Sequence, residues 1–285
     1  MTNVLITGIN SFIGDATERW LLEKKGYHVQ KISVRDESWK NISFQDYDVI
    51  IHVAGLAHAS LNSKDSNLYD KVNHLLTKEI ATKAKKEGVK HFIFLSSMIV
   101  YNAKQTKIDA STVPEPIGPY AKSKLNAEKA LRSISNDLFK VTILRPAMVY
   151  GLEGKGNFPK LVKLAQWSFV FPHIKNRRSM IYMDHLAEAI HQVIKHQHYG
   201  IFHLANQSPV ATYQIVQNMR QISGKKTYLT QLFNGFIHLA SNVSATLRKL
   251  FKDYYYRDEL INHTFKYHFV SFKHSIEETL RKKDG

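Results

Sequence analysis

Three polar side chains of the sequence have the types and the spacing of a proton-transfer group. Ser97 follows an apolar run, and Tyr120 and Lys124 lie four residues apart in a stretch rich in helix formers. This spacing places the phenol and the ammonium one turn apart on the same face of a helix. A nearby ammonium stabilises a phenolate, so we expect a lowered pKa for Tyr120 and proton exchange near neutral pH. Surface helices often show the same spacing, so a second motif is needed.

That second motif, at the N-terminus, has the pattern of a strand, a tight turn and a helix start. Residues 4–6 are an apolar run suited to a buried strand, and Gly8 permits a sharp turn because it has no Cβ. A helix starting near Ser11 would direct its free N–H groups and its positive end at the turn, where a pyrophosphate can bind. Gly14 would let this helix pack closely on the strand. The residues expected at the pyrophosphate are Gly8, Asn10, Ser11, Phe12, Ile13 and Gly14.

Together, the two motifs indicate hydride chemistry on a bound nicotinamide dinucleotide. The glycine motif is imperfect, because Ser11 stands where the usual dinucleotide fingerprint has its middle glycine. An ordinary strand–turn–helix unit has the same pattern. The position directly after a strand, upstream of Ser97 and Tyr120, favours the binding interpretation.

Length and composition fit a single globular enzyme. The chain has 285 residues, of which 44% are hydrophobic, enough for one large domain with or without a smaller lobe. The absence of cysteine excludes disulfides, a thiolate nucleophile and a cysteine metal site. No basic leader with an apolar stretch precedes the first strand, and no apolar run is long enough to span a bilayer. We therefore expect a cytoplasmic protein with no integral membrane segment.

The formal charge of +16 allows several partners. No nucleic-acid motif accompanies the charge, so we predict no nucleic-acid partner. Attraction to anionic lipid headgroups, attraction of phosphorylated substrates and a plain solvated surface stay open, and the last suits most of the lysines. The basic clusters are Lys83, Lys85, Lys86 and Lys90, then Lys175, Arg177 and Arg178, then Arg248, Lys249 and Lys252.

Apolar runs alternate with amphipathic stretches along the chain. We expect strands near residues 28–34, 49–54, 92–95, 141–144 and 201–204, and helices near 12–24, 68–86 and 120–133. This alternation predicts an α/β fold, a Rossmann-type parallel sheet with helices on both faces. Ligands of such sheets bind beyond the carboxyl ends of the strands. The motif residues fall at those ends: Gly8, Ala54, Gly55, Ser96 and Ser97.

Several segments together resemble the extended short-chain dehydrogenases/reductases, which include nucleotide-sugar epimerases, dehydratases and reductases. The departures from the family pattern are Ser11 and Asn102, each replacing a glycine. The matching segments are TGINSFIG at 7–14, HVAG at 52–55, VN at 72–73, SSMIVYN at 96–102, PYAKSK at 119–124, LRP at 144–146, VYG at 149–151 and RSMIYMD at 178–184.

The resemblance implies roles for these residues. Tyr120 would exchange the proton at a sugar hydroxyl or ketone, Lys124 would tune it and hold the nicotinamide ribose, and Ser97 would bind the reacting oxygen. Arg178 would hold the diphosphate of a nucleotide-sugar substrate, a UDP-sugar, and Asn157 would also contact it. Residues 1–154, completed by about 178–206, would bind NAD(P), and residues 155–177 and 207–285 would form a substrate-binding lobe.

The residues after Ser97 separate the reactions within this family. Family dehydratases carry an acidic pair there, whereas this chain has Met98 and Ile99, which cannot carry a proton. This leaves redox chemistry at a carbonyl, by an epimerase or a reductase. The segments 156–158 and 176–179 also resemble a narrower group, bacterial enzymes that reduce a UDP-4-keto-6-deoxy-N-acetylhexosamine for polysaccharide synthesis, and this resemblance implies that reduction. A UDP-sugar 4-epimerase is the alternative, and a non-catalytic cofactor-binding regulatory protein is a third, of another class. A homodimer stays open.

The end of the second strand indicates the preferred cofactor. NAD-binding members usually end it with an Asp that binds the ribose, but here Ser33 stands in that region and Arg35 follows. An arginine can hold a 2′-phosphate, so we expect NADP(H) to be preferred. NAD(H) remains the alternative if Asp36 or the backbone binds the ribose.

Two other patterns allow more than one interpretation. Apolar residues recur at helical spacing between 232 and 251, which fits a basic helix on a membrane surface or, as we favour, a helix packed over the sugar site. His191, His196 and His198 lie close together, but no carboxylate has the spacing of a zinc hydrolase. We expect the exposed end of a helix there, and no catalytic metal.

Overall fold

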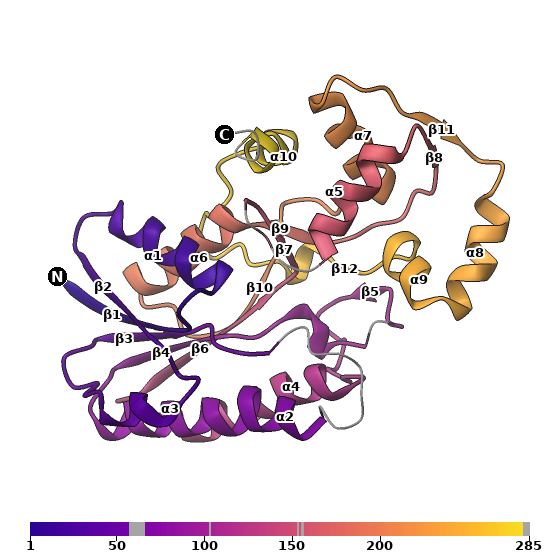
Figure 1. Ribbon diagram of the computed structural model, residues 1–285. Helices are drawn as coiled ribbons and strands as arrows, with labels where there is room; N and C mark the ends of the chain where they lie inside the picture. The colour runs from indigo at the N-terminus through magenta and orange to yellow at the C-terminus, as the bar shows by residue number, and fades with distance from the viewer. Residues whose placement is uncertain (57–65, 103, 153, 155–156, 282–285) are drawn as a thin grey trace.

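A parallel sheet forms the centre of the protein, whose computed structural model describes residues 1–56, 66–102, 104–152, 154 and 157–281 (Figure 1). All neighbouring strands of this six-stranded sheet are parallel. The predicted Rossmann-type α/β architecture is therefore confirmed. In sheet order the strands are β2 (Tyr27–Ile32), β1 (Thr2–Thr7), β3 (Val49–His52), β4 (His91–Leu95), β6 (Lys140–Pro146) and β10 (Gly200–Leu204).

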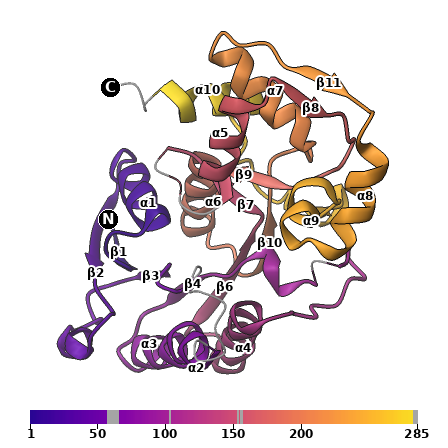
Figure 2. The ribbon, with the colours of Figure 1, turned by 45° about the vertical axis from the view of Figure 1, so that its right-hand side comes forward.

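Helices cover both faces of the sheet (Figure 2). One face carries α1 (Phe12–Leu22) and α6 (Met183–Lys195), and the other carries α2 (Ser66–Asp70), α3 (Leu76–Lys86) and α4 (Pro119–Ile134). Successive residues of β1 point to opposite faces, so Val4 and Ile6 pack with the first layer and Leu5 with the second. Because both faces are buried at its centre, the strand contains the unbroken apolar run Val4–Ile6.

The order of the strands reverses between β1 and β3. The chain passes from β1 to β2 on one side and then returns to β3 on the other side of β1. Ligands of open parallel sheets bind beyond the carboxyl ends of the strands at such a switch point. Residues 33–48 between β2 and β3 contain no strand, only the 3₁₀ turn Glu37–Asn41.

The remaining elements lie on the opposite side of the sheet from α3 and α4 (Figure 1). They share a separate apolar cluster that includes Phe158, Leu161, Ile215, Met219 and Ile276. The strands of this region pair two by two: β5 (Lys107–Ile108) with β12 (Tyr255–Tyr256), β7 (Met148–Tyr150) with β9 (Met180–Tyr182), and β8 (Val170–Pro172) with β11 (Tyr228–Thr230). Its helices are α5 (Asn157–Trp167), α7 (Thr212–Ile222), α8 (Asn234–Val243), α9 (Ala245–Phe251) and α10 (Phe272–Arg281).

The apolar stretch between 232 and 251 differs from the favoured expectation. It forms two helices, α8 and α9, because Ser244 ends the first and caps the second by accepting a hydrogen bond from the Leu247 N–H at 3.3 Å. Ile237 faces the apolar cluster, but Phe236 and Leu239 are 73% and 71% exposed. A helix that is apolar on two sides cannot bury both against one lobe, so only one apolar side of α8 packs on the protein and the other faces outward.

Neither a membrane span nor a metal cluster is found in the described part of the chain. No helix among these residues is long and apolar enough to cross a bilayer. These residues also contain no group of three histidines, aspartates or glutamates that could hold a metal ion. His191 is buried within α6 beside Glu188, at 3.3 Å, and does not lie at an exposed helix end.

Candidate functional site

The turn after β1 is shaped by close approach of two backbones. Gly8 has a φ of +121°, and a Cβ there would lie 3.2 Å from Val53 Cγ2 and 3.3 Å from the Ala54 nitrogen. Its N–H donates to the Ile32 carbonyl at 2.9 Å, which joins the turn to the end of β2. Asn10 also has a positive φ, of 59°. Glycine is therefore required at position 8, and the turn lies directly at the switch point of the sheet.

Ser11, the departure from the glycine fingerprint, caps α1. Its hydroxyl accepts a hydrogen bond from the Gly14 N–H at 3.3 Å, so the serine fixes the start of the helix at Phe12. A Cβ at Gly14 would lie only 3.2 Å from the Gly8 carbonyl oxygen. The N–H groups of Phe12 and Ile13 have no partner within the helix, and the positive end of its dipole faces the turn. This cradle fits a dinucleotide pyrophosphate.

The end of β2 offers a cation and no free carboxylate close to the strand. The Ser33 hydroxyl accepts a hydrogen bond from the Arg35 N–H at 3.3 Å, and the Arg35 side chain is exposed. Asp36 caps the following 3₁₀ turn by accepting from the Ser38 N–H at 2.9 Å. Hydrogen bonds from the hydroxyl and N–H of Ser38 lower the pKa of Asp36. The Asp36 carboxylate is thus engaged in its own turn.

Ala54 and Gly55, the cofactor-binding residues expected after β3, lie close to Asn73, a buried residue for which the sequence suggested no role. Ala54 borders the Gly8 turn, and a Cβ at Gly55 would lie 2.9 Å from Asn73 Oδ1 and 3.3 Å from Lys124 Nζ. Asn73 belongs to the π-helical turn Lys71–Leu75, a feature often found at functional sites. Its amide donates to Ser123 Oγ at 3.1 Å and its Oδ1 accepts from the Leu56 N–H at 2.8 Å, so Asn73 joins the segment after β3 to α4. The VN pair at residues 72–73 marked this asparagine in the sequence, but it did not indicate which residues Asn73 contacts.

Ser97 and Tyr120 come together although they lie on different elements. Ser97 follows β4, Tyr120 is in the first turn of α4, and their hydroxyls are hydrogen-bonded. Burial raises the pKa of Tyr120 to about 12, and the nearby Tyr69 also raises it, while the hydrogen bond from Ser97 acts in the opposite direction. The expected lowering of this pKa by Lys124 is therefore wrong, because desolvation of the phenolate outweighs any attraction.

Lys124 is buried one turn further along α4. Its ammonium donates to the Leu95 carbonyl at 2.9 Å and lies 4.7 Å from the centre of the Phe94 ring. Burial lowers the pKa of Lys124 to about 8, and the Glu128 carboxylate acts in the opposite direction. The structure thus places a buried ammonium at the end of β4, immediately before Ser96 and Ser97.

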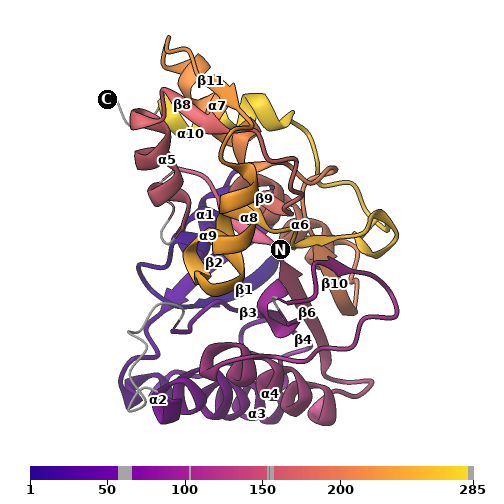
Figure 3. The ribbon, with the colours of Figure 1, turned by 90° about the vertical axis from the view of Figure 1, so that its right-hand side faces the viewer.

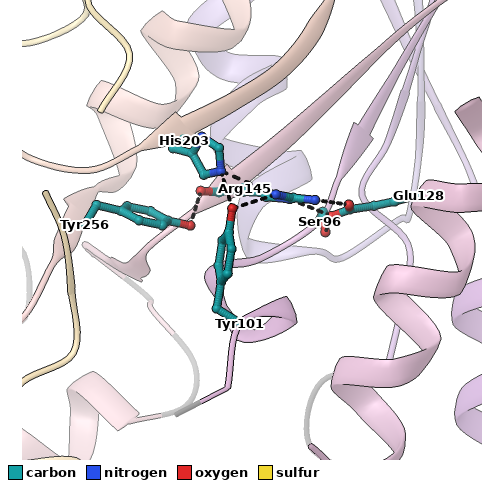
Figure 4. A network of polar contacts seen from close by, with 6 residues as sticks. All are labelled: Ser96, Tyr101, Glu128, Arg145, His203 and Tyr256. Atoms are coloured by element: carbon teal, nitrogen blue, oxygen red, sulfur yellow. Dashed lines mark hydrogen bonds and ion pairs between the residues drawn. The ribbon is translucent and has the colours of Figure 1, made fainter. Parts of the chain in front are cut away.

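A buried network of polar side chains joins β6 to α4 and to the turn after β4 (Figure 4). Arg145 of β6 donates to both carboxylate oxygens of Glu128 in α4, at 3.0 and 2.5 Å, and to the Tyr101 hydroxyl at 2.7 Å. Ser96 also donates to Glu128, and Tyr101 is 2.8 Å from His203 Nε2. Burial, followed by repulsion from Arg145, lowers the pKa of His203 to about 3. The sequence contains Arg145 within the LRP segment, but nothing in it identifies Glu128 as its partner.

The side chains of Arg178, which was expected to bind the substrate, and of its neighbour Arg177 lie in different surroundings. Arg178 is partly buried, its guanidinium donates to the Lys252 carbonyl at 3.3 Å, and burial lowers its pKa. The adjacent Tyr254 hydroxyl shares its proton between the carbonyls of Met98 and Tyr101, at 2.9 and 3.1 Å, in the turn after Ser97. Arg178 is thus paired through the backbone with Tyr254, the residue that contacts this turn.

Arg177, in contrast, faces outward. It is 57% exposed, lies 4.2 Å from the Tyr255 ring centre and pairs with Asp253 at 3.4 Å. Asn157 is the first residue of α5, and its side chain lies outside the described part of the structure. The backbone carbonyl of Arg177 also accepts from the Tyr254 N–H, at 2.9 Å, so the two arginines differ in their side chains: the guanidinium of Arg178 is half-buried and that of Arg177 faces solvent.

The parallel sheet, with its glycine turn and helix N-terminus at the switch point, defines a Rossmann-type dinucleotide-binding protein. The sequence profile of the NAD dependent epimerase/dehydratase family matches residues 4–205. The chain therefore belongs to this family and is an NAD(P)-dependent enzyme, as the resemblance implied.

Known proteins similar to the chain act on sugars. It is 28% identical to a UDP-glucose 4-epimerase of Vibrio cholerae over 256 residues, 79% of this chain and 77% of the relative. It is also 28% identical to the N-acetyl-alpha-D-glucosaminyl-diphospho-ditrans,octacis-undecaprenol 4-epimerase of Escherichia coli O157:H7, over 79% and 73% of the two chains. The UDP-glucuronic acid 4-epimerase of Bacillus cereus, solved with NAD, has the same fold, with a TM-score of 0.75, 19% identity and 97% of each chain covered.

The burial of Lys124 predicts a pH-dependent cost in stability. At neutral pH we expect Lys124→Met to raise the free energy of unfolding by about 2 kcal/mol, because the folded chain must bury an ammonium. The pKa is lower in the folded than in the unfolded state, so this cost falls as pH rises from about 8 towards the unfolded value. Urea unfolding at pH values on both sides of this window measures the gap between variant and wild type.

The exposed Lys122 of the same helix provides the control. Lys122→Met should change stability little and equally at every pH. A gap between Lys124→Met and wild type that stays constant across the window would contradict the buried-ammonium interpretation.

Proposed function

We propose that the protein reduces a 4-keto sugar carried on UDP, a UDP-4-keto-6-deoxy-N-acetylhexosamine, with NADPH. The observation that carries the proposal is the buried group after β4, in which Ser97 is hydrogen-bonded to Tyr120 and Lys124 lies one turn away. The next residues, Met98 and Ile99, offer neither an acid nor a base for the elimination of water. The group can therefore move one proton at a carbonyl or alcohol oxygen, which suits a redox step.

The proposed roles follow from the protonation states. When bound, the nicotinamide supplies or accepts the hydride at the sugar carbon. Tyr120, with a pKa raised to about 12, is a neutral phenol at pH 7 and can donate its proton to the carbonyl oxygen. Ser97 would hold that oxygen by a hydrogen bond. The Lys124 ammonium would offset the charge of the phenolate that remains.

The proposed division of the chain follows the same geometry. Residues 1–154, completed by about 178–206, would bind the cofactor, and residues 155–177 and 207–285 would bind the sugar. Ser33 and Arg35 at the end of β2 support NADPH, since Asp36 is engaged with Ser38 and Arg35 can reach a 2′-phosphate. A reductase consumes its cofactor in each turnover, so a preference for NADPH fits reduction.

A UDP-sugar 4-epimerase is the second candidate, because the relatives from Vibrio cholerae and Escherichia coli are both named as 4-epimerases. The same proton-transfer group would then remove a proton from a sugar hydroxyl and return it. The two functions differ in cofactor consumption. Purified protein with a UDP-4-keto sugar and NADPH should lose nicotinamide absorbance at one equivalent per product if it is a reductase. Interconversion of two UDP-sugars with no net loss would support the epimerase instead.

The proton donor can be removed without changing the shape of the site. We expect Tyr120→Phe to lower kcat by about 10²- to 10⁴-fold, because only the transferable proton is lost. NADPH affinity, measured by calorimetry, should stay near that of the wild type. Turnover close to wild type in this variant would exclude Tyr120 as the proton donor.

The cofactor preference depends on Arg35 in this proposal. We expect wild-type protein to bind NADPH more tightly than NADH, and Arg35→Ala to weaken NADPH by about 10- to 100-fold, as for the loss of a charge-assisted hydrogen bond. NADH affinity should hardly change, which makes NADH the internal control. Equal or tighter binding of NADH by the wild type would contradict the proposed 2′-phosphate site.

Alanine variants of the neighbouring residues Arg178 and Arg177 form a matched pair that tests binding of the substrate diphosphate. We expect Arg178→Ala to raise the KM for the nucleotide sugar by about 10- to 100-fold with little effect on cofactor affinity, since a planar fork holds a diphosphate at two points. Lysine at position 178 should restore binding only in part. Arg177→Ala should be nearly silent because its side chain faces outward. Similar, small effects of both alanine variants in steady-state kinetics would contradict this assignment.

A further inference from the structure

The apolar face of α8 has no partner within the described chain. Five large apolar residues in and just before this helix are between 58% and 87% exposed. Figure 3 views the side of the molecule on which α8 and α9 lie. Monomeric proteins seldom leave so many large apolar side chains together in water. We call these residues the α8 face: Leu232, Phe233, Phe236, Leu239 and Val243.

The arrangement of this face is helical and directed outward. Phe236, Leu239 and Val243 are spaced by three and four residues, so they form one stripe along α8. Ile237 and Ser241 lie on the opposite side and face the protein, where Ile237 packs on the lobe cluster and Ser241 is fully buried. The inner side of α8 thus packs on the protein, whereas the outer stripe makes no contribution to the hydrophobic core.

A second group of exposed apolar side chains lies on the elements that lead into α8. Strand β11 ends two residues before Leu232, and it pairs with β8. At this pair the rings of Phe169 and Tyr228 lie 5.0 Å apart, and both are more than half exposed. Trp167, at the end of α5, is 87% exposed. Exposed aromatic residues of this kind are typical of a water–lipid interface.

The two segments of the chain that contain the α8 face and its neighbouring elements carry positive charge only. Residues 157–183 and 207–252, which contain α5, β8, α7, β11, α8 and α9, include no aspartate or glutamate. The Arg248 guanidinium donates to the carbonyls of Asn242 and Ser241 at the end of α8, at 2.5 and 3.4 Å, and so lies beside the apolar stripe. The cations of these two segments are Lys160, Lys163, Lys175, Arg177, Arg178, Arg220, Lys225, Lys226, Arg248, Lys249 and Lys252.

We propose that the α8 face docks on an anionic phospholipid bilayer. Apolar side chains flanked by cations and free of carboxylates are the features of an interfacial helix, whose apolar stripe enters the boundary between headgroups and acyl chains. Each lysine or arginine near such a surface adds attraction to anionic lipid. A second copy of the chain fits poorly, because it would bring the same cations against these cations with no acid to pair them.

The test uses the complete protein and needs no substrate, so it is independent of the proposed function. Cosedimentation is measured with vesicles of phosphatidylcholine alone and with vesicles of which about a third is phosphatidylglycerol. We expect wild-type protein to bind the anionic vesicles at least tenfold more tightly, with loss at high salt. Phe236→Ser/Leu239→Ser should lower binding at least tenfold. Lys225→Gln/Lys226→Gln should lower it roughly 25-fold, at about a factor of five per lysine.

Matched controls place the same substitutions elsewhere on the surface. Leu22→Ser/Leu138→Ser removes two exposed leucines, 58% and 84% exposed, from other parts of the chain. Lys86→Gln/Lys90→Gln removes two exposed lysines near the end of α3. Both should bind anionic vesicles nearly like the wild type. Unchanged thermal unfolding and NADPH affinity of the α8 variants would show that the fold is intact.

Any of four results would overturn the proposal, the last of them the assignment of the α8 face to a second copy. One is the absence of binding to anionic vesicles, and another is equal binding to neutral ones. The third is equal loss in the α8 and control variants. A wild type that sediments as a dimer in solution and becomes a monomer in Phe236→Ser/Leu239→Ser would assign the α8 face to a second copy instead.

Discussion

The buried ion pair between Arg145 and Glu128 is the contact on which the geometry of the site depends. It joins β6 to α4, and Ser96 at the end of β4 binds the same carboxylate. Removal of one partner would leave an unpaired charge in the core, which typically costs about 3–5 kcal/mol. Helix α4 therefore cannot slide along the sheet. Because Lys124 lies one turn before Glu128 and Tyr120 two turns before it, the pair also fixes both of these side chains.

Burial shifts the pKa values of Tyr120 and Lys124 in opposite directions. It raises the pKa of Tyr120 to about 12 and lowers that of Lys124 to about 8, so that in each case the neutral form is favoured. The ammonium is kept in place by the Leu95 carbonyl and the Phe94 ring. A buried group that costs stability and lies beside a candidate proton donor is typical of functional sites, where perturbed pKa values are concentrated.

Positive charge is distributed unevenly over the protein, because some segments contain acidic residues and others do not. The segments 157–183 and 207–252 contain cations without a single carboxylate, whereas cations of β2 and α3 have acidic partners, as in the pairs of Lys31 with Glu18 and of Lys83 with Glu87. Asp253, just beyond these segments, pairs with Arg177, and anions from outside the chain would relieve the repulsion among the other cations. The net charge of the sequence did not show this, because it is a sum that contains no positions.

The sequence by itself determined the elements and the order of the motifs, because apolar periodicity and turn chemistry depend on near neighbours along the chain. It predicted the parallel sheet and the glycine turn, with Ser97 and Tyr120 at strand and helix ends. Only the tertiary structure decided that Asn73 lies against Gly55, that Glu128 is the partner of Arg145, and which side of α8 faces outward. These depend on contacts between residues distant in the chain and on the depth of burial, which three-dimensional packing creates and local spacing does not encode.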